Sequence, residues 1–147
     1  MAKIILVAML CVLSAAYTKG DFDKTGAIKE FMDNAEACKT ETGATPADID
    51  DMLNKKPASG KNGKCLRACL MKKYKVMNAD GKFDKAVGME HAVKWTNGDA
   101  EKMVVATEIA DFCEGLAVSS DHCDAAEEYG KCFKEQAKAH GIEKFEI

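Results

Sequence analysis

Cysteine is the residue type in this chain with the most chemistry to offer, because its sulfur can attack a substrate, ligate a metal or form a disulfide. The 147-residue sequence contains seven cysteines. One lies in an apolar N-terminal stretch, and the others are Cys38, Cys65, Cys69, Cys113, Cys123 and Cys132. These last six are an even number, and an even number of cysteines in a secreted chain predicts a disulfide framework. With all six thiols committed in this way and no other catalytic motif present, we expect a protein that is not an enzyme.

The three residues between Cys65 and Cys69 also allow a zinc interpretation, because closely spaced cysteine pairs are typical of structural zinc sites. No histidines follow at a spacing that would complete such a site, and an oxidising compartment favours disulfides. We therefore expect no metal and no cofactor.

The N-terminus has the features of a secretion signal. Lys3 is followed by an apolar run from Ile4 to Leu13, and residues 14–16 are small, as signal peptidase requires. The run is shorter than the roughly 20 residues needed to span a membrane. We expect residues 1–16 to be removed, with residues 18–20 as a second cleavage site. The protein would then be secreted, without stable insertion into a membrane.

The remaining residues 17–147 have the size of a single domain. Removing Lys3, or Lys3 and Lys19, takes the net charge from −3 to about −4 or −5. Lysines are scattered and are not grouped with aromatic residues. This mild acidity argues against a nucleic-acid partner.

The chain favours helix throughout, because it has two prolines and many Ala, Lys, Glu and Met residues. Apolar spacing and capping residues predict six helices. We expect them at about residues 25–42, 46–53, 62–74, 84–95, 99–113 and 121–140. A turn is expected at residues 78–81.

Helix geometry limits how the cysteines pair. Cys65 and Cys69 lie one turn apart and face the same way, so they should reach other elements. Cys123 and Cys132 would be about 13.5 Å apart on one helix at 1.5 Å per residue, whereas a disulfide needs Cα atoms within about 7 Å. These two exclusions leave ten of the 15 pairings that six cysteines allow.

The spacing resembles that of the six-cysteine insect odorant-binding and pheromone-binding proteins. Three residues between the second and third cysteines and eight between the fifth and sixth are the family's most fixed features, and both are found here. Residues 63–73 and the turn at residues 80–84 also look like the family's third helix and the segment after it. Within the family, the chain is most similar to the general odorant-binding branch of flies.

The resemblance implies an all-α, compact six-helix domain around an apolar cavity. It also implies the disulfides Cys38–Cys69, Cys65–Cys123 and Cys113–Cys132. The function implied is that of a secreted carrier of small hydrophobic ligands, such as odorants or pheromones, in sensillar lymph or another body fluid. An olfactory receptor or co-receptor would be its protein partner, and we expect a monomer or a weak dimer.

Aromatic, methionine and aliphatic side chains on the predicted helices are the candidate cavity wall. An apolar stripe at helical spacing is more often ordinary core, so the resemblance gives this assignment most of its weight. The candidates are Phe31, Met32, Met52, Leu70, Tyr74, Met89, His91, Trp95, Met103, Ile109, Phe112, Phe133 and Phe145. Tyr74 or Trp95 could supply one hydrogen bond to a ligand, and His91 could make binding sensitive to pH. The apolar tail at residues 142–147 could cover the cavity mouth.

Two other functions compete with that of a carrier. One is an interaction protein of the same fold, whose surface changes on ligand binding and is recognised by a partner outside olfaction. The other is a saposin-like lipid handler that works on membranes. The cysteine spacing and the weak membrane-binding character of the predicted helices disfavour the second.

Overall fold

The computed structural model describes residues 22–142, so the predicted signal peptide, Phe145 and the last residues of the proposed lid lie outside the described residues. The described part contains six α-helices and no strand beyond one isolated bridge between Met77 and Phe83. The helices are α2 (Lys24–Thr42), α3 (Pro46–Leu53), α4 (Lys61–Lys73), α5 (Lys85–Thr96), α6 (Ala100–Glu114) and α7 (His122–Ala139). The all-α prediction is confirmed.

Local side chains set most of the helix starts. An aspartate at the N-cap accepts a backbone N–H bond at the start of α2, α5, α6 and α7, the four residues being Asp23, Asp84, Asp99 and Asp121. At α3, Asp48 accepts bonds from the backbone nitrogen and the hydroxyl of Thr45, at 2.8 and 3.0 Å. Because these caps depend on neighbours in sequence, the boundaries fall within a residue or two of the predicted ones.

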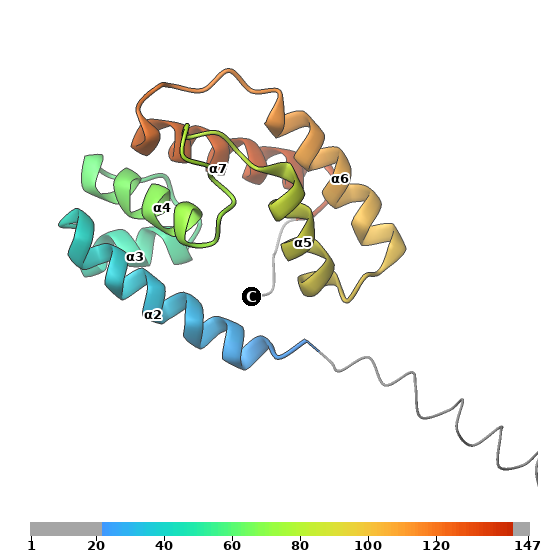
Figure 1. Ribbon diagram of the computed structural model, residues 1–147, viewed down its shortest axis with the longest axis horizontal. Coiled ribbons are helices and arrows are strands. Elements are labelled where there is room, and N and C mark those ends of the chain that lie inside the picture. Colours follow the sequence, from blue (N-terminus) through green and yellow to red (C-terminus); the bar gives the residue numbers. More distant parts are fainter. Residues whose placement is uncertain (1–21, 143–147) are drawn as a thin grey trace, which may run out of the picture.

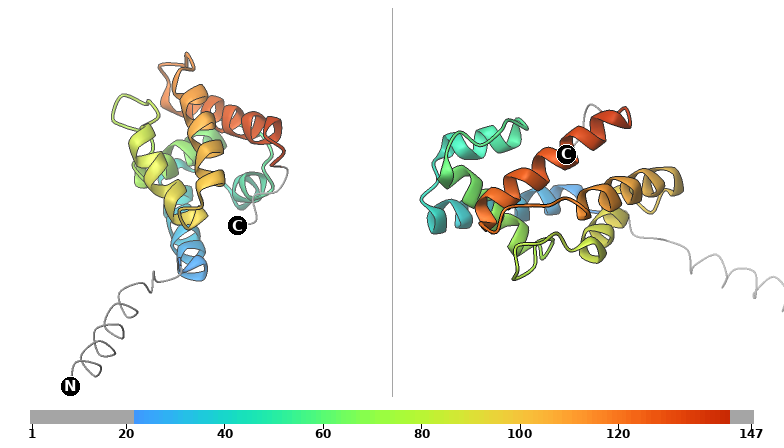
Figure 2. Two further views of the ribbon diagram at one scale, coloured as in Figure 1. Left: turned by 90° about the vertical axis from the view of Figure 1, so that its right-hand side faces the viewer. Right: turned by 90° about the horizontal axis from the view of Figure 1, so that it is seen from above.

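The helices form two groups that meet at α7 (Figures 1 and 2). In the first group, α4 packs against α2, α3 and α7, and α2 also packs against α3. In the second, α5 packs against α6, and α6 packs against α7. No other pair of the described helices is in close backbone contact. The α5–α6 hairpin is therefore attached to the rest of the described fold mainly through α7.

Three disulfides brace this arrangement with the predicted connectivity. Cys38–Cys69 joins α2 to α4, Cys65–Cys123 joins α4 to α7, and Cys113–Cys132 joins α6 to α7. Their Cα–Cα separations are 5.7, 4.3 and 5.9 Å. The third bridge is the one covalent link that the described disulfides make to the α5–α6 hairpin.

All the buried apolar residues of the described part except Ala110 belong to one of three clusters. The first, between α2, α3 and α4, contains Ala35, Cys38, Ile49, Leu66 and Leu70. The second, centred on α4 and α7, contains Ala68, Met77, Ala125, Ala126 and Tyr129. The third, between α6 and α7, contains Ile109, Cys113, Cys132 and Ala137. Helix α5 contributes no fully buried residue to any of them.

Candidate ligand-binding site

Most of the described wall candidates are neither fully buried nor freely exposed. Half-buried side chains are those of Phe31, Met32, Met52, Tyr74, Met89, His91, Met103 and Phe133, while Leu70 and Ile109 are buried. Of the half-buried candidates, Phe31, Met32, Met52, Tyr74 and Phe133 pack against the core clusters.

Five of these candidates gather at one place. Phe31, Met32, Met52 and Tyr74 pack around the first core cluster, which includes Leu70. They come from α2, α3 and the C-terminal end of α4, so segments up to about 40 residues apart in sequence meet there. The structure thus brings together side chains that were singled out separately on three helices.

Tyr74 extends this group to α5. Its ring stacks with Phe31 of α2 at a centroid distance of 6.4 Å and meets the ring of His91 of α5 edge-on at 5.7 Å. His91 Nε2 also lies 3.1 Å from the backbone carbonyl oxygen of Tyr74. Tyr74 is the C-cap of α4, where carbonyl groups lack partners within the helix. His91 therefore satisfies a helix-end carbonyl and ties α5 to α4.

Asn34 is a polar member of this region that was absent from the sequence-based candidates. Its Nδ2 donates to the hydroxyl oxygen of Tyr74 at 3.3 Å, and both side chains are half-buried. Asn34 lies three residues after Phe31, so a helical repeat could have placed it on the same face of α2. The contact with a residue 40 positions away had no signal in the sequence.

A second aromatic group surrounds Phe133. Its ring lies 5.0 Å from that of Phe83 and 6.4 Å from that of Tyr129, and it packs against both the second and the third core clusters. Phe83 and Tyr129 were also missed as candidates. Tyr129 lies four residues before Phe133 on α7, which is the spacing that could have revealed it.

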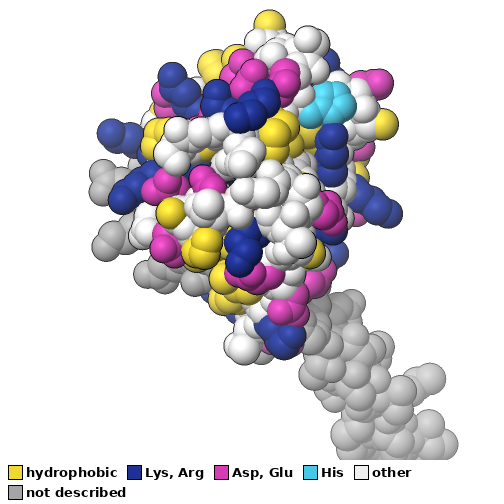
Figure 3. All heavy atoms as spheres, turned by 90° about the vertical axis from the view of Figure 1, so that its left-hand side faces the viewer, with side chains coloured by type: hydrophobic (Ala, Val, Ile, Leu, Met, Phe, Trp, Pro, Cys, Tyr) yellow, Lys and Arg dark blue, Asp and Glu magenta, His cyan; other side chains and the backbone are white. Residues whose placement is uncertain are grey.

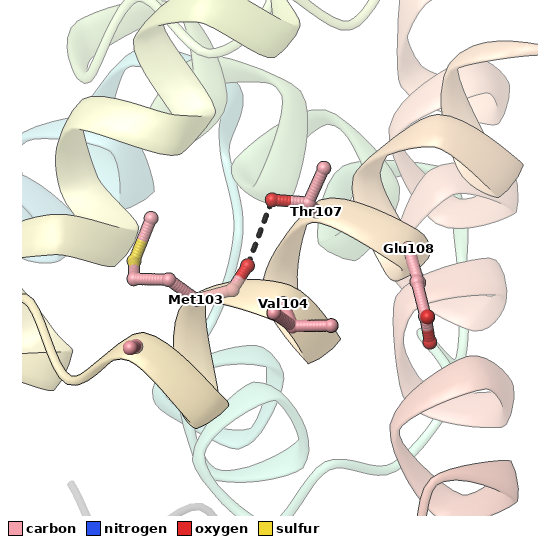
Figure 4. A pocket seen from close by; sticks show the side chains of 5 residues that line it. Met103, Val104, Thr107 and Glu108 are labelled. Carbon is pink, nitrogen blue, oxygen red and sulfur yellow. Dashed lines mark hydrogen bonds between the residues drawn. The ribbon is translucent and has the colours of Figure 1, made fainter.

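A hollow of about 310 Å³ lies against α6 and is lined by one further candidate, Met103 (Figure 4). The other lining residues are Ala100, Val104, Thr107 and Glu108. The hydroxyl of Thr107 donates to the carbonyl oxygen of Met103 at 2.7 Å, so its polar group is turned back to the helix. The hollow is therefore mostly apolar despite the polar residues at its edge.

Two candidates lie on the surface instead of in the interior. Phe112 is 60% exposed and Trp95 is 39% exposed. On α6 the buried face is formed by Ile109, Ala110 and Cys113, and one residue step turns a helix by about 100°. Phe112 is thereby rotated away from that face. Trp95 packs edge-on against Phe22, at a centroid distance of 4.8 Å, beside the start of α2.

A separate hollow of about 470 Å³ lies on the outside of the molecule, beside two of the disulfides. Its rim includes Lys72, whose Nζ lies 2.7 Å from His122 Nδ1, and Lys73, which pairs with Glu41 at 3.2 Å. Figure 3 shows that side chains of both charge signs are mixed over this end of the molecule, with hydrophobic ones in small separate patches. This face has no single-sign surface of the kind that binds a polyanion.

Charge pairs also fix the start of α7. Asp121 Oδ1 lies 2.7 Å from Lys61 Nζ and accepts bonds from the backbone nitrogens of Cys123 and Asp124. The hydrogen bond from Lys61, followed by that from the Asp124 backbone, lowers the pKa of Asp121 to about 2. The same contact raises the pKa of Lys61. This pair joins the N-terminal ends of α4 and α7 close to the Cys65–Cys123 bridge.

Within the described residues, no helix combines the length and the apolar character that crossing a membrane would require.

Known proteins are similar to this chain in both sequence and fold. The chain is 47% identical over 139 residues to general odorant-binding protein 28a of Drosophila melanogaster, covering 95% of this chain and 96% of that protein. It is 40% identical over 109 residues to general odorant-binding protein 19d of the same fly, covering 74% and 73% of the two chains.

Solved structures agree with these sequence relatives. The structure of the Drosophila 28a protein superposes with a TM-score of 0.74, covering 82% of this chain and 99% of that one. A fatty acid binding protein, OBP56a, from the oral disk of the blowfly Phormia regina shares the fold at 17% identity, with a TM-score of 0.63 over 78% and 94% of the two chains. The PBP/GOBP family matches this sequence over residues 21–136. With its three disulfides and six helices in the predicted arrangement, the chain belongs to the PBP/GOBP family.

Proposed function

We infer that this protein is a secreted carrier that holds one small hydrophobic ligand between α2, the end of α4, α5 and α6. The ligand would contact half-buried side chains of these four helices and of the C-cap of α4: Phe31, Met32, Tyr74, Met89, His91 and Met103. Three disulfides support an oxidising, extracellular setting. Transport of the ligand through that fluid to a receptor is part of the proposal.

The main support for this proposal is that the buried residues form three separate clusters instead of one core. A domain of this size usually has one contiguous core, packed as densely as an organic crystal. Here the buried residues form three clusters, and α5 has no buried residue although it carries Val87, Met89 and His91 half-buried. Apolar surface that faces inward without full packing would gain free energy by enclosing an apolar molecule.

The size of that gain is sufficient for a carrier. A ligand that buries about 300 Å² of apolar surface gains about 7.5 kcal/mol at 25 cal/mol per Å², and micromolar affinity corresponds to about 8.2 kcal/mol. The cost of immobilising the ligand is offset by close packing and one hydrogen bond. Because burial dominates, selectivity among apolar ligands of similar shape should be weak. Methionines in the wall favour such adaptability.

The relatives suggest which ligands to try. The names of the two Drosophila relatives refer to odorants, and the blowfly protein of the same fold is described as binding fatty acids. Volatile odorants and medium-chain fatty acids are therefore the first two classes to compare for this chain. Transport of such a ligand requires no catalysis, because burial in the protein is enough to keep an insoluble molecule in solution.

The test is a titration of the oxidised protein, without residues 1–16, with the fluorescent dye N-phenyl-1-naphthylamine, followed by displacement with odorants and fatty acids. We expect saturable one-to-one binding and competitive displacement. Replacing Met103 with Trp should weaken dye binding several-fold, because the larger side chain would fill space that the dye is proposed to occupy. The matched control on the same helix is Phe112→Ser, which should leave affinity unchanged because Phe112 is 60% exposed. An intact helical fold without saturable binding would overturn the carrier function and favour the interaction-protein alternative.

A further inference from the structure

Tyr74 is the place where a hydrogen-bonding group meets the apolar wall. Its ring is held between two partners of different helices, stacked with Phe31 and edge-on to His91. Its hydroxyl oxygen accepts a bond from Asn34 Nδ2 at 3.3 Å. These contacts fix the position of the hydroxyl group, which is the preorganisation that favours binding.

The hydroxyl hydrogen of Tyr74 is left available. A phenol is both a donor and an acceptor, and the acceptor side is used by Asn34. Among the described residues, no side chain or backbone carbonyl accepts from Tyr74 Oη. The group therefore offers one donor beside apolar side chains, in a half-buried position.

His91 does not compete for that hydrogen with its Nε2 atom. A carbonyl oxygen only accepts, so the 3.1 Å contact with the backbone oxygen of Tyr74 requires that Nε2 carry a proton. In the neutral ring, Nδ1 is then the acceptor. The tautomer of His91 is thus set by the end of α4, and Nε2 is committed to the backbone.

We propose that the Tyr74 hydroxyl, positioned by Asn34, donates a hydrogen bond to an oxygen atom of the bound ligand. The preferred ligand class is accordingly a lipophile with one hydrogen-bond-accepting oxygen, such as a ketone or an aldehyde, over a hydrocarbon of the same shape. This inference rests on the proposed carrier function. A net hydrogen bond of ordinary strength corresponds to about a three- to ten-fold preference in Kd.

The experiment compares undecan-2-one with undecane as competitors of N-phenyl-1-naphthylamine, in the wild-type protein and in Tyr74→Phe. We expect the wild type to bind the ketone about three- to ten-fold more tightly than the alkane. Tyr74→Phe keeps the ring, so it should remove the preference by weakening the ketone alone. Tyr129→Phe is the matched control, because Tyr129 is 1% exposed in a different cluster.

A second measurement reports the bond itself. The infrared carbonyl band of bound undecan-2-one should lie at lower frequency in the wild type than in Tyr74→Phe. Equal ketone preference in the two proteins, or no preference in the wild type, would overturn the inference while leaving the carrier function intact. If the wild type bound neither the dye nor the alkane, the carrier function itself would be overturned. These two failures are therefore distinguishable.

Discussion

Arg67 Nη1 of α4 lies 2.8 Å from Glu127 Oε2 of α7, and both side chains are largely shielded, at 16% and 19% exposed. The pair also holds the loop between α3 and α4, because Glu127 accepts from the backbone nitrogen of Ala58 at 2.8 Å and Arg67 donates to the carbonyl oxygen of Lys56. Arg67 is the only arginine in the chain. Its planar guanidinium reaches two acceptors at once, which a lysine ammonium does less well.

Breaking this pair should be costly. Arg67→Met leaves the Glu127 carboxylate shielded without its cation, and we expect the free energy of unfolding to fall by about 2–3 kcal/mol. Denaturant unfolding followed by circular dichroism would measure the change. The exposed pair of Lys131 and Glu135, at 3.8 Å with side chains 74% and 63% exposed, is the control. Lys131→Met should change stability by less than about 0.5 kcal/mol. Equal effects of the two variants would contradict the stabilising role of the Arg67–Glu127 pair.

Two glycines in helices should respond oppositely to alanine. A Cβ at Gly88 of α5 would lie 2.7 Å from the ring of Phe83, which is itself packed against Phe133. Because that ring has little room to move, Gly88→Ala should destabilise the fold by about 1–3 kcal/mol. Gly130 of α7 has no atom within 4 Å of its Cβ position, so Gly130→Ala should stabilise by up to about 1 kcal/mol. Thermal unfolding of the two variants tests the sign of each stability change. Stabilisation by Gly88→Ala would show that the Phe83 ring can move aside.

Removal of the disulfide that holds the α5–α6 hairpin should weaken ligand binding as well as stability. Removing Cys113–Cys132 or Cys38–Cys69 by paired alanine substitutions opens loops with sequence separations of 19 and 31 residues. The chain-entropy model assigns each about 3–4 kcal/mol. Only the first joins α6 to α7, so its loss should also loosen the α5–α6 hairpin and weaken dye binding. Dye affinity that stays unchanged on removing Cys113–Cys132 would contradict the proposed site.

The start of α7 should make stability depend on acid pH. The pKa of Asp121 is about 2 in the folded protein, whereas an unfolded Asp titrates near pH 3.9. The carboxylate therefore stabilises the fold fully above about pH 5, and this contribution is lost as the pH falls toward 2. We expect the difference in unfolding free energy between the wild type and Asp121→Asn to be largest near pH 6 and to be mostly lost by pH 2.

Lys61→Met supplies the check on this cause. Lys61 makes the largest contribution to the lowered pKa of Asp121. In that variant the Asp121→Asn substitution should therefore show a weaker dependence on pH. An unchanged dependence would mean that the backbone N–H groups of α7, and not the lysine, hold the carboxylate in its ionised form.

Much of the fold could be predicted because its causes are local in sequence. Capping aspartates and helical apolar spacing placed all six described helices within a residue or two. The cysteine spacing, through its resemblance to the family, gave the three disulfides that the structure contains. Spacing alone had left ten pairings open, because it limits which cysteines share a helix face but not which helices meet.

Which residues line the proposed ligand site depended on the tertiary structure. A helix has one inward face, and its rotation is set by the helices that it packs against, so apolar type alone placed Phe112 and Trp95 in the wall although both are exposed. Asn34 was missed for the converse reason, since its partner Tyr74 lies 40 residues away. The sequence by itself determined the helices and, through the family, their crosslinks. The packing of α2, α4 and α5 around Tyr74 decided which side chains meet, because those contacts join segments that are distant in sequence.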